Sequence, residues 1–165
     1  MGLVYQDIPR IYTAIAEWAV CIVYILLLKR RFSIWKTVAV AAAFLAVQSA
    51  VLVFTASVSL FWWFPVMMVA FFNMYLFIHV CCEGKSMVIV YCAASAFIIS
   101  EFAASFEWLL YYYFAYCLGR NTEVLKVVFL IGIYLLVIAA AWKAEKRLLS
   151  RGARLTVYHK EMFSV

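Results

Sequence analysis

Residues 8–31 of this 165-residue chain read IPRIYTAIAEWAVCIVYILLLKRR. The apolar run from Ile8 to Leu28 ends at three consecutive basic residues that begin with Lys29. A helix needs about 20 predominantly apolar residues to cross the hydrocarbon core of a bilayer. The run has that length, and a basic stop is typical of a membrane boundary. This stretch therefore predicts a transmembrane helix near the start of the chain.

The composition extends this prediction to the whole chain. Hydrophobic residues make up 70% of it and charged residues 13%, whereas a soluble domain is about 45–50% apolar. The net charge of +6 does not indicate nucleic-acid binding, because the basic residues lie at the ends of apolar runs. The first run has no marked cleavage site for a signal peptide, so we expect it to be retained. The lipid bilayer is the first partner that the sequence implies.

Further apolar segments along the chain predict an all-α fold, a polytopic membrane bundle of about five helices. The predicted spans are about residues 8–28, 37–54, 61–80, 86–108 and 124–142, and a basic cytoplasmic tail follows at 143–165. We expect the tail to begin as a helix that continues the fifth span. It is expected to become irregular around Arg151 and Gly152.

The Lys and Arg residues predict the orientation of this bundle in the membrane. With the N-terminus outside, eleven of the 14 basic residues face the cytoplasm, and Arg10, Arg120 and Lys126 face outside. The bias has the same sign at every loop for five helices, and a count of four or six would break that agreement. We therefore predict a multi-pass plasma-membrane protein with an outside N-terminus and a cytoplasmic C-terminus.

The fourth apolar segment is too long for a simple crossing. Residues 86–118 contain no Lys, Arg, Gly or Pro, and a continuous helix of this length would be about 50 Å long. Two paths fit the sequence. The helix protrudes from the membrane, or it bends near Glu107 and Trp108 and lies in the interface, where Tyr111, Tyr112 and Tyr113 suit an aromatic belt.

Three acids fall inside or close to the apolar runs, namely Glu17, Glu101 and Glu107. A charge at bilayer depth is costly, so such residues normally face the bundle interior or water. One interpretation is a ligand or proton site built from Glu17, Glu101 and polar partners such as Gln48 and Asn73. The other is an internal polar clasp that fixes helix packing, which the sequence favours. Glu107, next to Trp108, is expected at the outer interface.

Two stripes of small residues recur at a spacing of four, which places each stripe on one helix face. Small residues allow helices to approach closely inside a membrane. We expect both stripes to serve helix packing, and dimerisation through one of them is a special case that the sequence does not separate. The stripes are Cys92, Ala96, Ser100 and Ala104 in the fourth segment, and Ala42, Ala46 and Ala50 in the second.

The sequence contains no pattern typical of catalysis or metal binding. Its five cysteines include no Cys-x-x-Cys pair, its two histidines are isolated, and no glycine-rich phosphate loop is present. We predict no catalytic residue, no metal and no cofactor, and hence no enzyme within this chain.

Two short segments resemble a known family. Residues 8–18 (IPRIYTAIAEW) and residues 96–108 (AFIISEFAASFEW) are similar to the N-terminal membrane region of bacterial GHKL-type sensor histidine kinases. The resemblance implies a polytopic sensor whose full-length members add a dimerising helix and an ATP-binding domain. No ATP-binding motif can be placed on this chain. The resemblance therefore carries over no catalytic residue, only positions that match the recurring segments: Arg10, Glu17, Trp18, Glu101, Glu107 and Trp108.

Three functions follow as hypotheses. The first is a membrane sensor or receptor module of a two-component-type system, responding to a peptide or a small molecule. It would act as a homodimer or through a downstream signalling domain. The second is a small transporter or the substrate-binding subunit of one, which shares the intramembrane acids. The third is a structural or assembly partner, which would tolerate neutral substitutions at all three acids.

Overall fold

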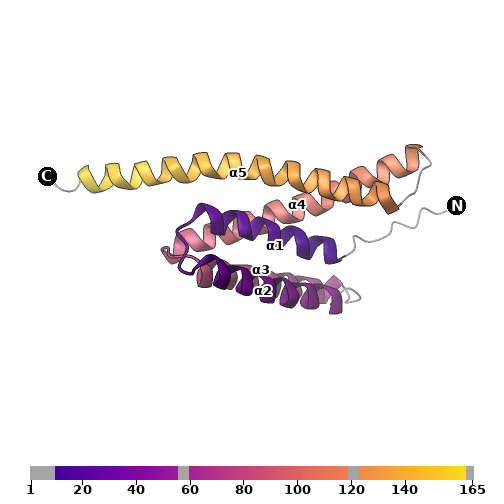
Figure 1. Ribbon diagram of the computed structural model, residues 1–165, viewed down its shortest axis with the longest axis horizontal. Coiled ribbons are helices and arrows are strands. Elements are labelled where there is room, and N and C mark those ends of the chain that lie inside the picture. The colour runs from indigo at the N-terminus through magenta and orange to yellow at the C-terminus, as the bar shows by residue number, and fades with distance from the viewer. Residues whose placement is uncertain (1–9, 56–59, 119–122, 163–165) are drawn as a thin grey trace.

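The computed structural model describes residues 10–55, 60–118 and 123–162, and the side chains of 60, 115–125 and 148–162 are outside the described set. The described chain is all-α (Figure 1). Five of its helices are long and apolar enough to cross a membrane, which makes this a multi-pass membrane protein and confirms the predicted fold class. The helices are α1 (Arg10–Leu27), α2 (Ile34–Phe54), α3 (Leu60–Cys81), α4 (Ser86–Leu118) and α5 (Glu123–Met162).

The helices extend furthest past the predicted spans at the start of α2 and at the ends of α4 and α5. α2 begins at Ile34, before the predicted 37, and the Thr37 amide donates to the Ser33 carbonyl at 3.0 Å to close its first turn. α4 continues as one helix past Glu107 and Trp108 to Leu118, beyond the predicted end at 108. Figure 1 shows α4 and the beginning of α5 extending beyond the other helices.

The predicted irregularity in the tail is wrong, because α5 continues as a helix through Arg151 and Gly152 to Met162. One glycine inside a helix costs only about 0.5–1 kcal/mol relative to alanine. The surrounding Leu, Ala, Lys and Arg residues are good helix formers, and this outweighs the single glycine. A 40-residue helix is about 60 Å long, and its C-terminal part extends well past the bundle (Figure 1).

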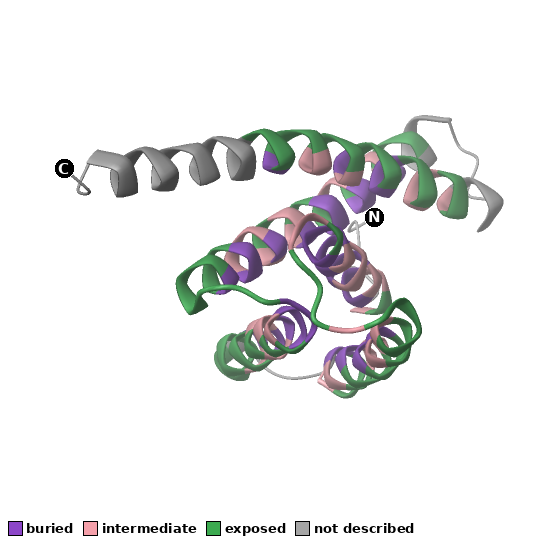
Figure 2. Ribbon diagram, turned by 60° about the vertical axis from the view of Figure 1, so that its left-hand side comes forward, coloured by how far each residue is buried: buried purple, intermediate pink, exposed green. Residues whose placement is uncertain are grey.

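α1 lies at the centre of the bundle, where it contacts each of the other four helices. Half of its spanning segment is buried, compared with 17% in α2 and in α5. Within the described residues, α5 contacts α1 and α4 and neither α2 nor α3. Figure 2 shows the buried residues where helices face one another and the exposed residues on the outer sides. The exposed side chains on these outer sides are mainly large and apolar, as lipid contact requires.

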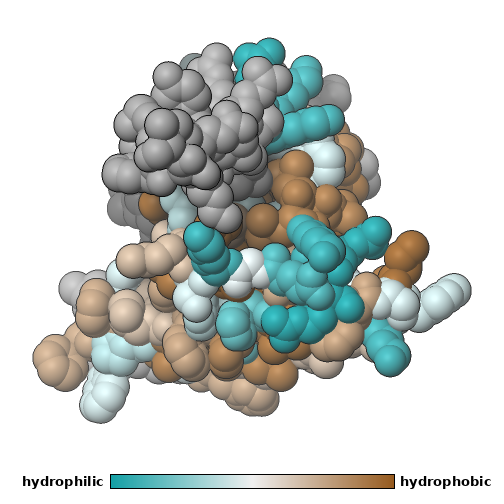
Figure 3. Space-filling view, turned by 90° about the vertical axis from the view of Figure 1, so that its left-hand side faces the viewer, coloured by the Kyte–Doolittle hydropathy of each residue, from teal (hydrophilic) through white to brown (hydrophobic). Residues whose placement is uncertain are grey.

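One end of the bundle, here called the basic end, carries exposed cations at Lys29, Arg30, Arg31, Lys36 and Lys85. Figure 3 looks onto this end and shows hydrophilic side chains gathered within an apolar surround. The two loops there are joined by backbone hydrogen bonds, from Arg31 N–H to the Cys81 carbonyl at 2.8 Å and from Glu83 N–H to the Lys29 carbonyl at 2.9 Å.

A salt bridge adds to this connection between the loops. Lys29 Nζ lies 3.0 Å from Glu83 Oε2, and its hydrogen bond and its positive charge both lower the pKa of the Glu83 carboxyl group. Next to it, burial raises the pKa of the Cys82 thiol to about 11, so this cysteine remains a neutral thiol near pH 7.

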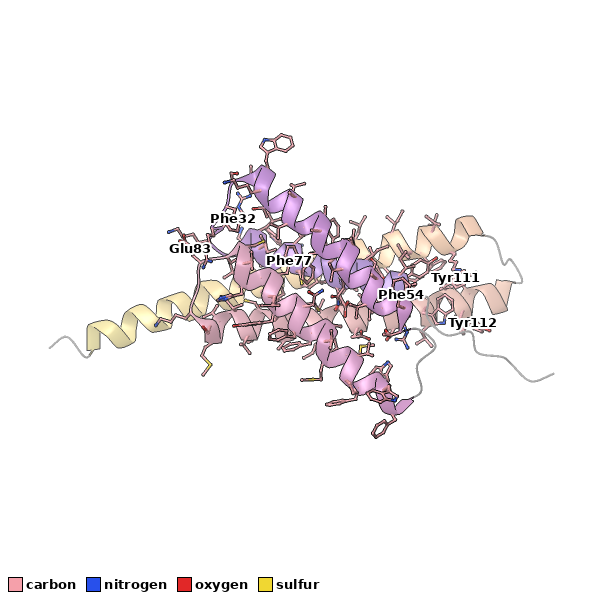
Figure 4. All side chains as sticks on the ribbon, turned by 90° about the horizontal axis from the view of Figure 1, so that it is seen from below. Phe32, Phe54, Phe77, Glu83, Tyr111 and Tyr112 are labelled. Carbon is pink, nitrogen blue, oxygen red and sulfur yellow. The ribbon has the colours of Figure 1, made fainter. Side chains whose placement is uncertain are left out.

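The opposite end, here called the aromatic end, carries Tyr12, Trp108, Tyr111 and Tyr112. Figure 4 shows Tyr111 and Tyr112 at the far side of the bundle from Phe32 and Glu83. Arg10 and Lys126 are the basic residues at this end within the described part of the chain, and Arg120 lies outside the described residues. We predicted the orientation from this uneven distribution of basic residues, and that prediction places the basic end in the cytoplasm.

Candidate functional site

A row of polar side chains crosses the middle of the bundle from α1 to α3. The Gln48 amide nitrogen on α2 donates to Glu17 Oε2 on α1 at 2.6 Å. The Asn73 amide nitrogen on α3 donates to Gln48 Oε1, also at 2.6 Å. Glu17 and Gln48 are fully buried. The structure therefore brings together three of the polar residues that the sequence singled out, and Gln48 lies between the other two.

Glu101 on α4 faces the Glu17 end of this row. The two carboxyl groups interact electrostatically, and the guanidinium of Arg10 acts on Glu101 from the start of α1. One oxygen of each carboxyl group, Oε1 in both, is buried without a hydrogen-bond partner. Glu17 and Glu101 thus offer two unused acceptors on facing helices. Such acceptors could share a proton or bind a donor from a small polar ligand.

Trp18 connects α1 to α2 beside this row. Its indole N–H donates to the Ala41 carbonyl at 2.9 Å, across two neighbouring helices. An indole N–H at a partly buried position normally finds such a partner, so this contact fits a role of Trp18 in packing. Trp18 therefore supports the row and does not point a free group into it.

Glu107 lies at the aromatic end, where it is enclosed by protein. Its side chain has no exposed surface, and both carboxylate oxygens lack a hydrogen-bond partner. The Lys126 ammonium on α5 interacts electrostatically with it. Lys126 Nζ also lies 5.7 Å from the ring centroid of Tyr12 and 5.7 Å from that of Trp108. Sequence reasoning missed this group because it depends on α5 packing against α1 and α4.

A second group that sequence reasoning missed lies toward the basic end. Glu145 on α5 is only 5% exposed, and one of its oxygens has no hydrogen-bond partner. It lies against the Tyr24 hydroxyl of α1, which also interacts with Ser95 of α4. A single acid among Lys143, Lys146 and Arg147 was a signal that could have been noticed, but the segment was interpreted as a solvated tail.

The two small-residue stripes differ in the structure. Cys92, Ala96, Ser100 and Ala104 are 0–1% exposed and line the face of α4 toward the bundle. Ala42, Ala46 and Ala50 are all exposed, so they do not pack against another helix of this chain. The buried face of α2 is instead Ala41, Phe44, Gln48 and Leu52. The predicted packing of the second stripe within the chain is corrected accordingly, because the polar Gln48 requires the interior and determines which face turns inward.

Three or more His, Cys, Asp or Glu side chains do not gather in metal-binding geometry anywhere in the described residues. No protein-family model, curated protein or solved structure matches this chain. The resemblance to the sensor-kinase membrane region therefore stays a prediction.

Proposed function

We propose that this chain is a membrane-embedded sensor module of a bacterial two-component-type signalling system, located in the plasma membrane. The observation that carries the proposal is α5, one 40-residue helix that extends past the basic end and whose contacts, among the described residues, are with α1 and α4. Those are the two helices that carry the buried acids Glu17 and Glu107 and the half-buried Glu101. A change in how α1 and α4 pack would therefore reach the cytoplasm through a single rigid element.

The contacts of α5 suit a helix with two alternative positions. Its spanning segment is only 17% buried, so little packing holds it in place. Polar contacts hold it at both ends, Lys126 and Tyr134 at the aromatic end and Glu145 at the basic end. The Tyr134 hydroxyl donates to the Tyr12 carbonyl at 2.8 Å. A ligand that binds one position of α5 better than the other would shift the equilibrium between them.

The second candidate, a small transporter, is favoured by the polar row and its two unused carboxylate oxygens. Transporters bind substrates near the bilayer midplane, commonly at interrupted helices. Here α3 and α5 run without interruption through Pro65 and Gly132. Transport predicts a substrate that co-purifies with the protein and is lost on Glu17→Gln substitution, which signalling does not require.

The test fuses a histidine-kinase catalytic core after Val165 and measures autophosphorylation in membranes. Insertion of one, two, three or four alanines after Trp142 rotates the output by about 100° per residue. If α5 relays the signal, the output oscillates and recovers after three or four insertions. Output that is constant or falls steadily contradicts the proposal.

Point variants then test which residues belong to the sensing element. Glu17→Gln and Glu101→Gln are expected to shift the basal output, and Glu83→Gln, an exposed acid at the basic end, is the matched control. If both buried-acid variants fold and signal like the control, these acids are not part of the sensing element.

A further inference from the structure

The aromatic end contains the components of a site for an organic cation. Glu107 provides a carboxylate that is fully buried and has no hydrogen-bond donor on either oxygen. Tyr12 and Trp108 provide two aromatic rings, from α1 and α4, whose faces attract a positive charge. A buried carboxylate without donors is unfavourable, and an ammonium group carries three N–H donors.

The chain itself places a cation there. Lys126 Nζ stands 5.7 Å from both ring centroids, within the range of a cation–π contact. It attracts Glu107, yet no salt bridge joins the two among the described residues. The lysine, fixed to α5, thus satisfies the charge of the site without supplying the hydrogen bonds that Glu107 lacks.

Two contacts around the rings do not involve Lys126. The Tyr134 hydroxyl donates to the Tyr12 backbone carbonyl at 2.8 Å, which fixes the α1 backbone beside the site, and the Trp108 ring packs against the Tyr111 ring at 5.9 Å between centroids. Trp108 is only 8% exposed. The site would therefore persist if the Lys126 side chain left it.

We propose that Tyr12, Trp108 and Glu107 form a binding site for a primary ammonium group, which Lys126 of the same chain occupies and an external amine can replace. The amine belongs to a small molecule or to a lysine of a peptide, and the shared chemistry is an ammonium on an alkyl chain. The proposal of a binding site depends only on the geometry of these residues. The further proposal, that the bound amine is the signal and releases the start of α5, rests on the proposed function.

The experiment restores the missing cation in the purified full chain. Lys126→Ala removes the tethered ammonium, and n-butylammonium chloride, which reproduces the lysine side chain, is titrated by calorimetry against a potassium chloride blank. We expect saturable binding at one site per chain. Adding Glu107→Gln to this variant is expected to weaken binding by roughly tenfold, since it removes the charge that the ammonium would meet. Lys143→Ala, an exposed lysine on the same helix, is the matched control and should show no such binding.

Two results overturn the proposal. One is that Lys126→Ala binds n-butylammonium no better than Lys143→Ala does. The other is that Glu107→Gln leaves the affinity unchanged. A parallel titration with N-acetyl-lysine methylamide distinguishes the sources, because tighter binding than n-butylammonium identifies a peptide lysine and weaker binding a free amine.

The native chain provides a second measurement if Lys126→Ala fails to fold. Acylation by an N-hydroxysuccinimide ester, followed by mass spectrometry, should modify Lys126 at least several-fold more slowly than Lys143, and Glu107→Gln should accelerate it. Equal rates, or no response to Glu107→Gln, contradict the proposal. Neither binding nor acylation depends on kinase output. A bound amine without altered output from the fused kinase would therefore refute the sensor role and leave the site intact.

Discussion

Glu17 and Glu107 are both fully buried acids in apolar helices, and their surroundings differ in kind. Glu17 accepts a hydrogen bond from a neutral amide at 2.6 Å, and that amide is itself held by Asn73. Glu107 accepts none, and its partner is the flexible, charged side chain of Lys126 on the loosely packed α5. The first arrangement joins helices at fixed positions, whereas the second pairs groups that can separate. The difference indicates where the bundle is held and where it can change.

The largest expected effect comes from breaking the polar row at its centre. Gln48→Leu removes both hydrogen bonds and leaves Glu17 and Asn73 without these partners. We expect a loss of about 2–3 kcal/mol in the free energy of unfolding, measured in detergent against a denaturant. Val47→Leu, on the exposed side of the same helix, is the control and should change the stability by less than about 0.5 kcal/mol. A Gln48→Leu variant as stable as this control would show that the row does not hold the helices.

The next prediction compares the two sites directly, by replacing each acid with the same apolar residue, methionine. Glu17→Met should destabilise the bundle by about 1–2 kcal/mol, because Gln48 loses its acceptor. Glu107→Met should change the stability by about 0.5 kcal/mol or less, because no hydrogen bond is lost. Equal losses in the two unfolding curves would remove the distinction between the two sites.

A smaller effect is expected for the contact that fixes α5 to α1 at the aromatic end. Tyr134→Phe removes the hydrogen bond to the Tyr12 carbonyl, which is worth about 0.6 kcal/mol between membrane helices. Hydrogen exchange should increase in α5 more than in α2, because the lost hydrogen bond is made by α5 and α2 takes no part in it. A uniform increase across all helices would indicate global loosening instead of release of α5.

The smallest effect concerns the salt bridge at the basic end. Lys29 lowers the folded-state pKa of Glu83 below its usual value of 4.5. A carboxyl group whose pKa is lower in the folded state stabilises the fold fully above its unfolded-state pKa. This stabilisation is lost as the pH falls through the folded-state pKa. We expect a slight fall in the melting temperature below pH 4.5 that Glu83→Gln abolishes and high salt reduces. A fall that persists in Glu83→Gln must come from another carboxyl group.

The predictions from sequence succeeded where one physical constraint acts on a continuous stretch. The thickness of the hydrocarbon core determines how long an apolar run must be, so five spans could be identified from composition alone. The inward face of α2 could not, since Ala42, Ala46 and Ala50 offered a regular stripe and Gln48 only a single polar position. The end of α5 was mispredicted because one glycine was given more weight than the long run of helix formers around it.

Contacts between helices form the sites, and the order of residues within one helix does not determine those contacts. The amino-acid order alone predicts the membrane class, the number of helices, the charge difference between the ends and the importance of the buried acids. It does not predict that Gln48 lies between Glu17 and Asn73, or that Lys126 enters the space between Tyr12 and Trp108. The first depends on the packing of α2 against α1 and α3, and the second on the packing of α5 against α1 and α4. The hydrophobic effect drives each helix into the membrane without selecting its neighbours, and side-chain packing and hydrogen bonds then select them.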